Sequence, residues 1–203
     1  MAYLVGSLPT GYLVARAKGL DIRVVGSGNI GATNVFRTLG KPAGVTVLVV
    51  DGLKGFAACT WCTDLILDAF GIPLTGAPAE RIVAGIAVVL GHNFTCWLRF
   101  KGGKGIATSA GVYFALAWQA ALLALGSWVV VLVVARYVSL ASVTAAVALP
   151  VAVWLTQDNA ALRIVTLALG ALAIYKHRAN LQRLLRGTEH RLGAKKPAPE
   201  AAR

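Results

Sequence analysis

The sequence predicts an all-α integral membrane protein with about seven transmembrane helices, two of them short. Of its 203 residues, 57% are hydrophobic and only 14% charged, and the mean hydropathy of +0.70 is too high for an ordinary soluble domain. Several apolar runs are separated by short polar segments. The formal net charge of +12 comes from Lys and Arg between these runs and in the C-terminal tail. This distribution is typical of positive-inside loops beside anionic lipid, so we expect membrane lipid, and no nucleic acid, as a partner.

Residues Met1–Val14 are predicted to form the first membrane helix, with its N-terminus outside. The segment is short and apolar, and Pro9 predicts a kink within it. Its positive charges, Arg16 and Lys18, follow the apolar run, whereas a signal peptide carries them before the run. A membrane helix therefore fits this segment better than a cleaved leader.

The polar segment Gly19–Leu39 is predicted to be a ligand-binding loop. Its run Gly26-Ser27-Gly28-Asn29-Ile30-Gly31 has the G-x-G-x-x-G spacing of a dinucleotide-binding turn, and Asp51 lies at a suitable distance for a ribose contact. We reject that fold because an apolar run begins at Pro42 and leaves no room for a parallel sheet. A flexible connector remains the alternative. The groups suited to a phosphorylated ligand are those of Ser27, Asn29, Asn34 and, downstream, Arg37.

The second helix is predicted from Ala43 to about Leu67, and it contains two charges. Asp51 and Lys54 are three residues apart and so share one helix face, where each offsets the other's cost of leaving water. They form a structural ion pair, or Lys54 faces a site at the cytoplasmic end. The sequence leaves both interpretations open.

The third helix, Arg81–Leu98, leads into the stretch with the strongest functional signal. It holds an imidazole, a carboxamide and two ammonium groups with three glycines between apolar segments. Glycine N–H groups beside lysines can cradle a phosphate-like anion, and a helix beginning at Ile106 would add its dipole. A loop that anchors two helices by lysine snorkelling is the alternative, but it does not explain the glycines. The residues are His92, Asn93, Lys101, Gly102, Gly103, Lys104 and Gly105.

About thirty mostly apolar residues follow Lys104, and they are predicted to form two short antiparallel helices. A single crossing would place Arg136 and, two helices later, the basic tail outside, against the positive-inside rule. A break near Ala117–Gln119 keeps both inside. Short helices at membrane depth are tolerated where they line a cavity. We therefore expect seven helices and not six.

The last two membrane helices are predicted at Val138–Gln157 and Ala160–Tyr175. Ser139 and Ser142, near the start of the first, face the cytoplasmic end unless they bond back to their own helix. An amphipathic segment around Leu181–Leu185 is expected to lie along the headgroups. We expect residues 1–190 to form one polytopic membrane domain and residues 191–203 a basic, disordered tail.

Four polar clusters together resemble the bacterial membrane glycerol-3-phosphate acyltransferases that use acyl phosphate as donor, the PlsY family. The resemblance covers nearly the whole chain in order, although Ala179 stands where many members have an acidic residue and the N-terminus is short. The matching segments are Ser27-Gly28-Asn29-Ile30-Gly31-Ala32-Thr33-Asn34 with Arg37, Gly91-His92-Asn93-Phe94 with Lys101-Gly102-Gly103-Lys104-Gly105, Arg136-Tyr137-Val138-Ser139-Leu140, and His177-Arg178-x-Asn180 with Gly187-Thr188-Glu189.

The resemblance implies a multi-pass enzyme of the bacterial inner membrane with its site facing the cytoplasm. It implies transfer of an acyl group from acyl phosphate to glycerol 3-phosphate, which gives lysophosphatidic acid and phosphate in phospholipid biosynthesis. No cofactor or metal is expected, and Cys59-x-x-Cys62 lacks the second pair of a zinc site. The peripheral enzyme that makes acyl phosphate is a further candidate partner.

The catalytic residues we expect are Lys104, His92, Arg37 and Ser27. His92 has Trp97, and not Asp, five residues on, so it does not form the His-x4-Asp pair of other acyltransferases. We expect His92 and His177 to orient substrates or assist proton transfer, with the donor's own phosphate as an alternative base. The residues expected to bind substrate are Asn29, Asn34, Asn93, Lys101, Gly102, Gly103, Gly105, Ser139, Ser142, His177 and Asn180.

A membrane carrier for a phosphorylated small anion is the rival function. Against it, the sequence has no visible inverted repeat, and Asp51 is the only clear acid in mid-membrane for coupling to an ion. Acyl-CoA and acyl carrier protein remain open as donors. Nothing in the sequence suggests a pantetheine or adenine pocket.

Overall fold

The computed structural model describes residues 1–73 and 78–193, and these residues form helices and loops without a strand. The prediction of an all-α fold is therefore confirmed for the described residues. The predicted disordered tail falls largely on residues 194–203, outside that range. The helices are α1 (Ala2–Ser7), α2 (Thr10–Arg16), α3 (Ala32–Leu39), α4 (Lys41–Cys59), α5 (Trp61–Ala69), α6 (Pro78–Asn93), α7 (Ile106–Leu116), α8 (Trp118–Ala135), α9 (Val138–Thr156), α10 (Ala160–Lys176) and α11 (Arg178–Leu185), with 3-10 turns at Ile22–Val24 and Cys96–Leu98.

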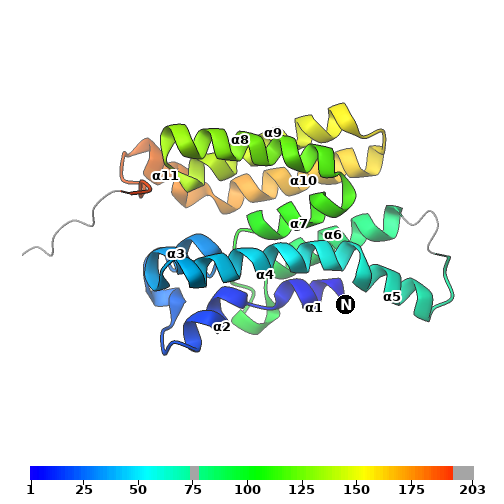
Figure 1. The fold of residues 1–203 in the computed structure, drawn as a ribbon, viewed down its shortest axis with the longest axis horizontal. Coiled ribbons are helices and arrows are strands. Elements are labelled where there is room, and N and C mark those ends of the chain that lie inside the picture. Colours follow the sequence, from blue (N-terminus) through cyan, green and yellow to red (C-terminus); the bar gives the residue numbers. More distant parts are fainter. Residues whose placement is uncertain (74–77, 194–203) are drawn as a thin grey trace, which may run out of the picture.

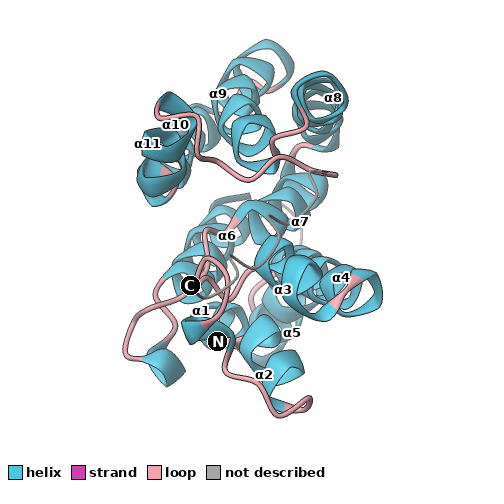
Figure 2. Ribbon diagram, turned by 90° about the vertical axis from the view of Figure 1, so that its left-hand side faces the viewer, coloured by secondary structure: helices cyan, strands magenta, loops and turns pink. Residues whose placement is uncertain are grey.

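The helices form two groups with α7 between them (Figures 1 and 2). One group contains α1–α6, and the other contains α8–α11. Among the described residues, four segments could cross a membrane by length and composition, or five if the bent pair α10 and α11 is one span. The four are Lys41–Ala69, Pro78–Leu98, Trp118–Ala135 and Val138–Thr156. The number of seven spans stays a prediction.

Two predicted helices are broken in the structure. The predicted kink at Pro9 separates α1 from α2, because proline offers no N–H to continue the helix. The predicted second helix breaks at Thr60, whose φ of −118° and ψ of −99° end α4 before α5 begins. No proline or glycine marks that second break, so hydropathy alone did not reveal it.

The region after Lys104 contains the two expected helices, although only one of them is short. Ala117 separates α7 from α8 at the predicted position, and the chain reverses there (Figure 1). Helix α7 has 11 residues, but α8 has 18 and is long enough to cross a bilayer. The expectation of a short second helix was wrong because the apolar run after Ala117 continues without a break to Ala135.

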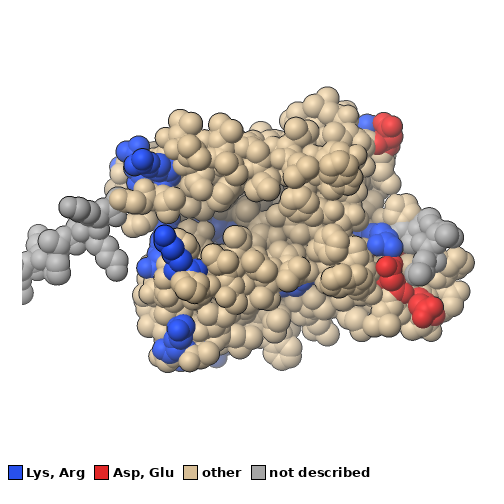
Figure 3. Space-filling view, viewed as in Figure 1, with Lys and Arg blue, Asp and Glu red and all other residues tan. Residues whose placement is uncertain are grey.

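Charged side chains separate along the long axis of the molecule (Figure 3). Lys and Arg gather at the end where α3 and α11 lie, whereas the visible Asp and Glu lie at the opposite end. Two of the acids at this end pair with arginines. The Asp64–Arg81 and Asp158–Arg163 pairs have O–N distances of 2.6 and 3.1 Å.

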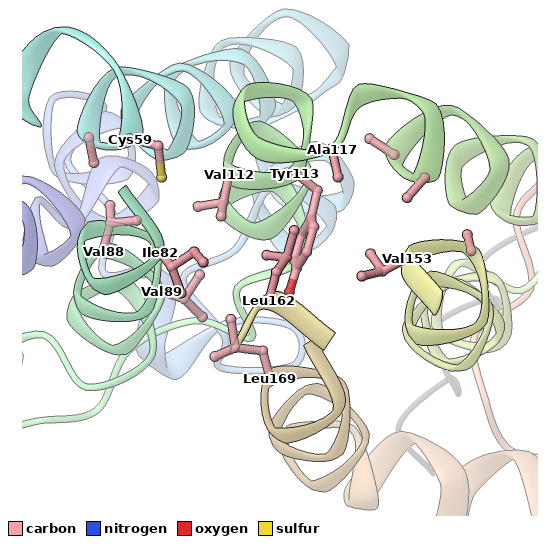
Figure 4. Packing of buried hydrophobic residues seen from close by; sticks show 14 residues of the cluster. Cys59, Ile82, Val88, Val89, Val112, Tyr113, Ala117, Val153, Leu162 and Leu169 are labelled. Carbon is pink, nitrogen blue, oxygen red and sulfur yellow. The ribbon is translucent and has the colours of Figure 1, made fainter. Parts of the chain in front are cut away.

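The buried core joins α7 to helices of both groups (Figure 4). Tyr113 of α7 is 1% exposed and points between Leu162, Leu169 and Val153 of α9 and α10. Cys59 lies in the same cluster as a free, buried thiol. The core therefore fixes α7, which begins at the polar stretch around Lys104, relative to its neighbours.

Glycines bring α4 and α7 into close contact. A Cβ on Gly111 would lie 1.9 Å from the carbonyl oxygen of Gly52, and one on Gly55 would lie 2.1 Å from that of Thr108. Small residues at such positions let two backbones approach in a membrane, where packing rather than the hydrophobic effect holds helices together.

Gly111→Ala is expected to destabilise the fold, because the new methyl group forces α4 and α7 apart. We expect a loss of about 1–3 kcal/mol, typical of overpacking, and a lower Tm in detergent. Gly126→Ala on α8 is the matched control, since nothing lies within 4 Å of its Cβ position. Equal Tm values for the two variants would contradict the proposed role of the glycine contact.

Candidate active site

A polar cavity of about 130 Å³ lies between the two helix groups. Its walls come from the loop before α3, from α3, α4 and α6, from the start of α7, from α8 and α9, and from His177, α11 and the loop that follows. Segments far apart in the sequence therefore meet here. The sequence-predicted residues that line it are Ser27, Asn29, Asn34, Arg37, His92, Lys104, Gly105, Ser139, Ser142, His177 and Asn180.

Asn34 organises the loop on one side of the cavity. Its Oδ1 accepts a hydrogen bond from the Ser27 N–H at 3.0 Å, and its Nδ2 donates to the carbonyl of Asn29 at 2.9 Å. A Cβ on Gly26, whose φ is +63°, would lie 2.4 Å from this Oδ1. Asn34 is 3% exposed and its amide is occupied, so its role is to hold Ser27 and Asn29 in place.

Two cationic side chains, Arg37 and Lys104, face the cavity. The Nε of Arg37 is buried and has no hydrogen-bond partner among the described residues. Burial lowers the pKa of Arg37 from its ordinary value. Burial also lowers the pKa of Lys104 to about 8, although Glu189 opposes this shift. A buried cation that lacks a full set of partners favours an anionic ligand.

Glu189 is the central site residue to which the sequence analysis gave no role, although it belongs to one of the matching segments. Its Oε1 accepts hydrogen bonds from Asn180 Nδ2 at 2.8 Å and Ser139 Oγ at 2.9 Å, and its Oε2 accepts one from Arg183 Nε at 2.7 Å. Lys104 donates to the Oδ1 of the same Asn180. Burial alone would raise the pKa of Glu189, but these hydrogen bonds outweigh it and lower the pKa.

The network runs from Glu189 through Asn180 to Lys104, and so fixes the ammonium group at the cavity wall. A signal for it existed in the sequence: Glu189 is an isolated acid in the basic region after Asp158. An acid in such a setting is expected to pair with cations.

The two candidate histidines differ in their surroundings. His177 is 3% exposed, and its Nδ1 lies 2.8 Å from the carbonyl oxygen of Ala173. That contact requires the proton on Nδ1, which leaves Nε2 of a neutral ring as an acceptor. His92 lies with Nδ1 3.7 Å from Asp51 Oδ1, and its ring packs against Gly103.

Four predicted site residues do not line the cavity. The side chain of Lys101 is exposed on the protein surface, and that of Asn93 is buried beneath the loop. The N–H groups of Gly102 and Gly103 donate to the carbonyls of Asn93 and His92, at 3.2 and 3.0 Å. Contrary to expectation, these two N–H groups are therefore not free to cradle a phosphate, because they hold the loop back against α6.

Asp51 and Lys54 form a buried ion pair with a 2.7 Å O–N distance. Thr10 donates to Asp51 at 3.0 Å, and Lys54 donates to the Leu8 carbonyl at 3.1 Å. The pair thus ties α4 to the break between α1 and α2. Asp51 reaches the cavity wall, whereas Lys54 is not among the residues that line it.

An apolar groove of about 200 Å³ adjoins the polar cavity. The two share Leu48, Ile106, Ala107 and Trp128 in their walls. The indole N–H of Trp128 donates to Ser142 Oγ at 3.2 Å, which places the ring at the border between them. A ligand with a polar head and an apolar chain matches this combination.

Comparisons with known proteins point to one family. A family model described as glycerol-3-phosphate acyltransferase matches residues 1–187. The glycerol-3-phosphate acyltransferase of Geotalea daltonii is 46% identical over 189 residues, which cover 93% of each chain. The sequence resemblance is thus confirmed across nearly the whole chain.

Two crystal structures of PlsY (YgiH), an integral membrane glycerol 3-phosphate acyltransferase, are also similar. The glycerol 3-phosphate form gives a TM-score of 0.84 at 42% identity and covers 95% of this chain and 92% of that chain. The lysophosphatidic acid form gives 0.81 at 41% identity, with the same coverage. The chain therefore belongs to the glycerol-3-phosphate acyltransferase family and is an integral membrane protein.

Proposed function

We propose that this protein transfers a fatty acyl group from acyl phosphate to glycerol 3-phosphate. The products are lysophosphatidic acid and inorganic phosphate, and the reaction belongs to phospholipid biosynthesis. The observation that carries the proposal is the junction of a cationic polar cavity with an apolar groove at Trp128. The two substrates together require such a pair, because both carry a phosphate and one carries a long apolar chain.

The cations of the cavity supply the phosphate clamp. Arg37 has a buried Nε that no described residue uses, and Lys104 has only Asn180 as a hydrogen-bond partner among the described residues. Since both line one cavity, they favour two phosphate groups side by side and neutralise the charge on both. Ser27 and Asn29, on the loop that Asn34 shapes, face the same space and can bind hydroxyl or phosphate oxygens.

The chemistry needs positioning more than a strong base. A hydroxyl oxygen of glycerol 3-phosphate attacks the acyl carbonyl, the bond from that carbonyl to the donor's phosphate oxygen breaks, and phosphate leaves. Acyl phosphate is an activated mixed anhydride, so orientation and charge neutralisation can supply much of the rate. The hydroxyl proton passes to the leaving phosphate, or to Nε2 of His177. The reaction uses no metal or cofactor.

The charge distribution supports a site that faces the cytoplasm of a bacterial cell. Lys and Arg gather at the end of the molecule near α3 and α11 (Figure 3), and positive loops mark the cytoplasmic side of an inner-membrane protein. In this orientation the basic C-terminal end lies inside and Met1 toward the outside, as seven crossings require. A peripheral enzyme that makes acyl phosphate could then deliver the donor at the same face.

The test is acyl transfer to glycerol 3-phosphate by purified protein in detergent, with acyl phosphate, acyl-CoA and acyl carrier protein offered in parallel. We expect lysophosphatidic acid from acyl phosphate alone. Product from either thioester at a similar rate would overturn the donor assignment. Folded protein that makes no product, yet exchanges labelled glycerol 3-phosphate across proteoliposomes, would identify a carrier instead.

A further inference from the structure

The apolar groove has a mouth and a far end that the helix directions define. At the mouth lie Ile106 at the start of α7 and Trp128 in the middle of α8, both of which also border the polar cavity. At the far end lie Tyr113, Ala121 and Leu149. Small side chains leave the space between these ends open: Ala107, Ala110, Ala124, Ala145, Ala146, Gly170 and Ala173.

The length of the groove, measured along three of the helices that line it, is the same. Ile106 to Tyr113 on α7 and Trp128 to Ala121 on α8 each span seven residues, which is about 10 Å of helix. Ser142 of the polar cavity to Leu149 on α9 spans the same length. An extended hydrocarbon chain advances roughly 1.3 Å per carbon, so the groove holds about eight carbons.

Tyr113 closes the far end. Its hydroxyl donates to Thr166 Oγ1 at 2.8 Å, and that hydroxyl donates to the Leu162 carbonyl at 2.6 Å. Both side chains of the pair are fully buried, at 1% and 0% exposure. The ring stands across the space between α7 and α10 (Figure 4), so the groove ends in packed core.

Although the far end of the groove is closed, one side of it opens to the outer surface of the molecule. Phe114 and Leu125 line the groove and are 36% and 44% exposed on the outer surface of the molecule. In a membrane this surface meets lipid. A chain longer than the groove can therefore turn outward between them into the bilayer.

We propose that Tyr113 is a specificity-determining residue, the end wall of a groove that measures the first carbons of the acyl chain. The inference rests on the proposed acyl transfer. Acyl-chain carbons that lie between the mouth and Tyr113 leave water or lipid and contact the walls of the groove. Carbons beyond Tyr113 remain in lipid. Filling the groove at different depths should then exclude chains of different lengths.

The experiment uses acyl phosphates with four to sixteen carbons and reports the variant-to-wild-type ratio of kcat/KM at each length. This ratio cancels the partition of each donor into detergent. Ala124→Leu blocks the groove midway and Ala121→Leu blocks its far end. Each displaced methylene should lower the ratio about fourfold. The fall should begin three to four carbons earlier in Ala124→Leu, because Ala121 lies three residues deeper, about 4.5 Å.

The exposed Ala171 of α10 gives the matched control, Ala171→Leu, whose ratio should stay near one at every length. Tyr113→Ala should raise the ratio for chains longer than about eight carbons relative to shorter ones, whereas Tyr113→Phe, which keeps the ring, should not. If Tyr113→Ala fails to fold, the two leucine variants still decide.

Ratios that do not depend on chain length, or that fall at the same length in both leucine variants, would overturn the end-wall inference and leave the proposed function intact. A wild-type protein that transfers no acyl group from any acyl phosphate would instead overturn the proposed function, and this inference with it.

Discussion

Lys104→Ala is expected to lower kcat/KM for acyl transfer by about 10²–10³-fold, which corresponds to roughly 3–4 kcal/mol of transition-state stabilisation. The side chain faces the polar cavity and is held by Asn180, which is held in turn by Glu189. In the proposed reaction, negative charge moves from the acyl carbonyl to the departing phosphate. An ammonium group that is already fixed in place stabilises this developing charge more than it stabilises the charge distribution of the ground state.

The chain offers a matched control three residues away. Lys101 belongs to the same loop and has the same chemistry, but it is exposed and lies outside the cavity. Lys101→Ala should therefore keep kcat/KM within about twofold of wild type, as expected for a solvated surface charge. Lys104→Arg should recover part of the lost activity, since it keeps the charge in an altered shape.

Steady-state kinetics with both substrates, together with Tm values in detergent, would check the result. Similar activities for Lys101→Ala and Lys104→Ala would refute the clamp. So would a large fall in Tm for Lys104→Ala alone, since the lost activity would then reflect a damaged fold.

The contrast between Lys101 and Lys104 shows where sequence reasoning ends. Both lysines lie in one glycine-rich loop, and the sequence placed both in the site, Lys104 as catalytic and Lys101 as substrate-binding. The chain then folds back so that Gly102 and Gly103 bond to carbonyls of α6, and Gly105 adopts a φ of +81° to start α7. These local turns decide which ammonium group enters the cavity, and no pattern of residue types encodes their direction.

The positions of the helices were more predictable than the direction of this loop, because a helix that lies in lipid must consist mostly of apolar residues. Helix α9 begins at the predicted Val138, and the break between α7 and α8 falls at Ala117 as expected. The break at Thr60 was missed because the apolar pattern continues through it. Hydropathy reports which residues leave water, and it does not report where a helix bends.

The role of Glu189 also depends on the fold and could not be read from the residue types around it. Its carboxylate contacts Ser139 of α9, Asn180 and Arg183, so its role depends on how the C-terminal segment returns to α9. A backbone bond from the Leu192 N–H to the Arg136 carbonyl, at 2.7 Å, holds that return. The sequence placed Glu189 in a matching segment without a role, and only the fold gives its carboxylate three donors.

Glu189→Gln is expected to lower kcat/KM by about 10- to 100-fold at neutral pH, the scale of one hydrogen bond to a charged group. The amide keeps an oxygen for Asn180 and Ser139, but its NH₂ faces the guanidinium of Arg183, and two donors cannot bond. Asn180 then holds Lys104 less firmly. The substitution also removes the negative charge that raises the pKa of Lys104.

The pH profile separates these two effects. Wild-type Lys104 has a pKa of about 8, so its charged form dominates below that pH, and kcat/KM should fall as the pH rises through it. Without the Glu189 charge, the neighbouring Arg37, Arg183 and Lys176 lower that pKa further. The alkaline limb of kcat/KM should therefore move to lower pH in Glu189→Gln.

Asp158→Asn is the matched control, because it removes one carboxylate charge at the opposite end of the molecule. Asp158 is fully exposed and pairs with Arg163, so its alkaline limb should coincide with that of wild type. A Glu189→Gln protein that is slower by the same factor at every pH would show that Glu189 only supports packing. An alkaline limb that moves to lower pH would show that the charge of Glu189 keeps Lys104 protonated.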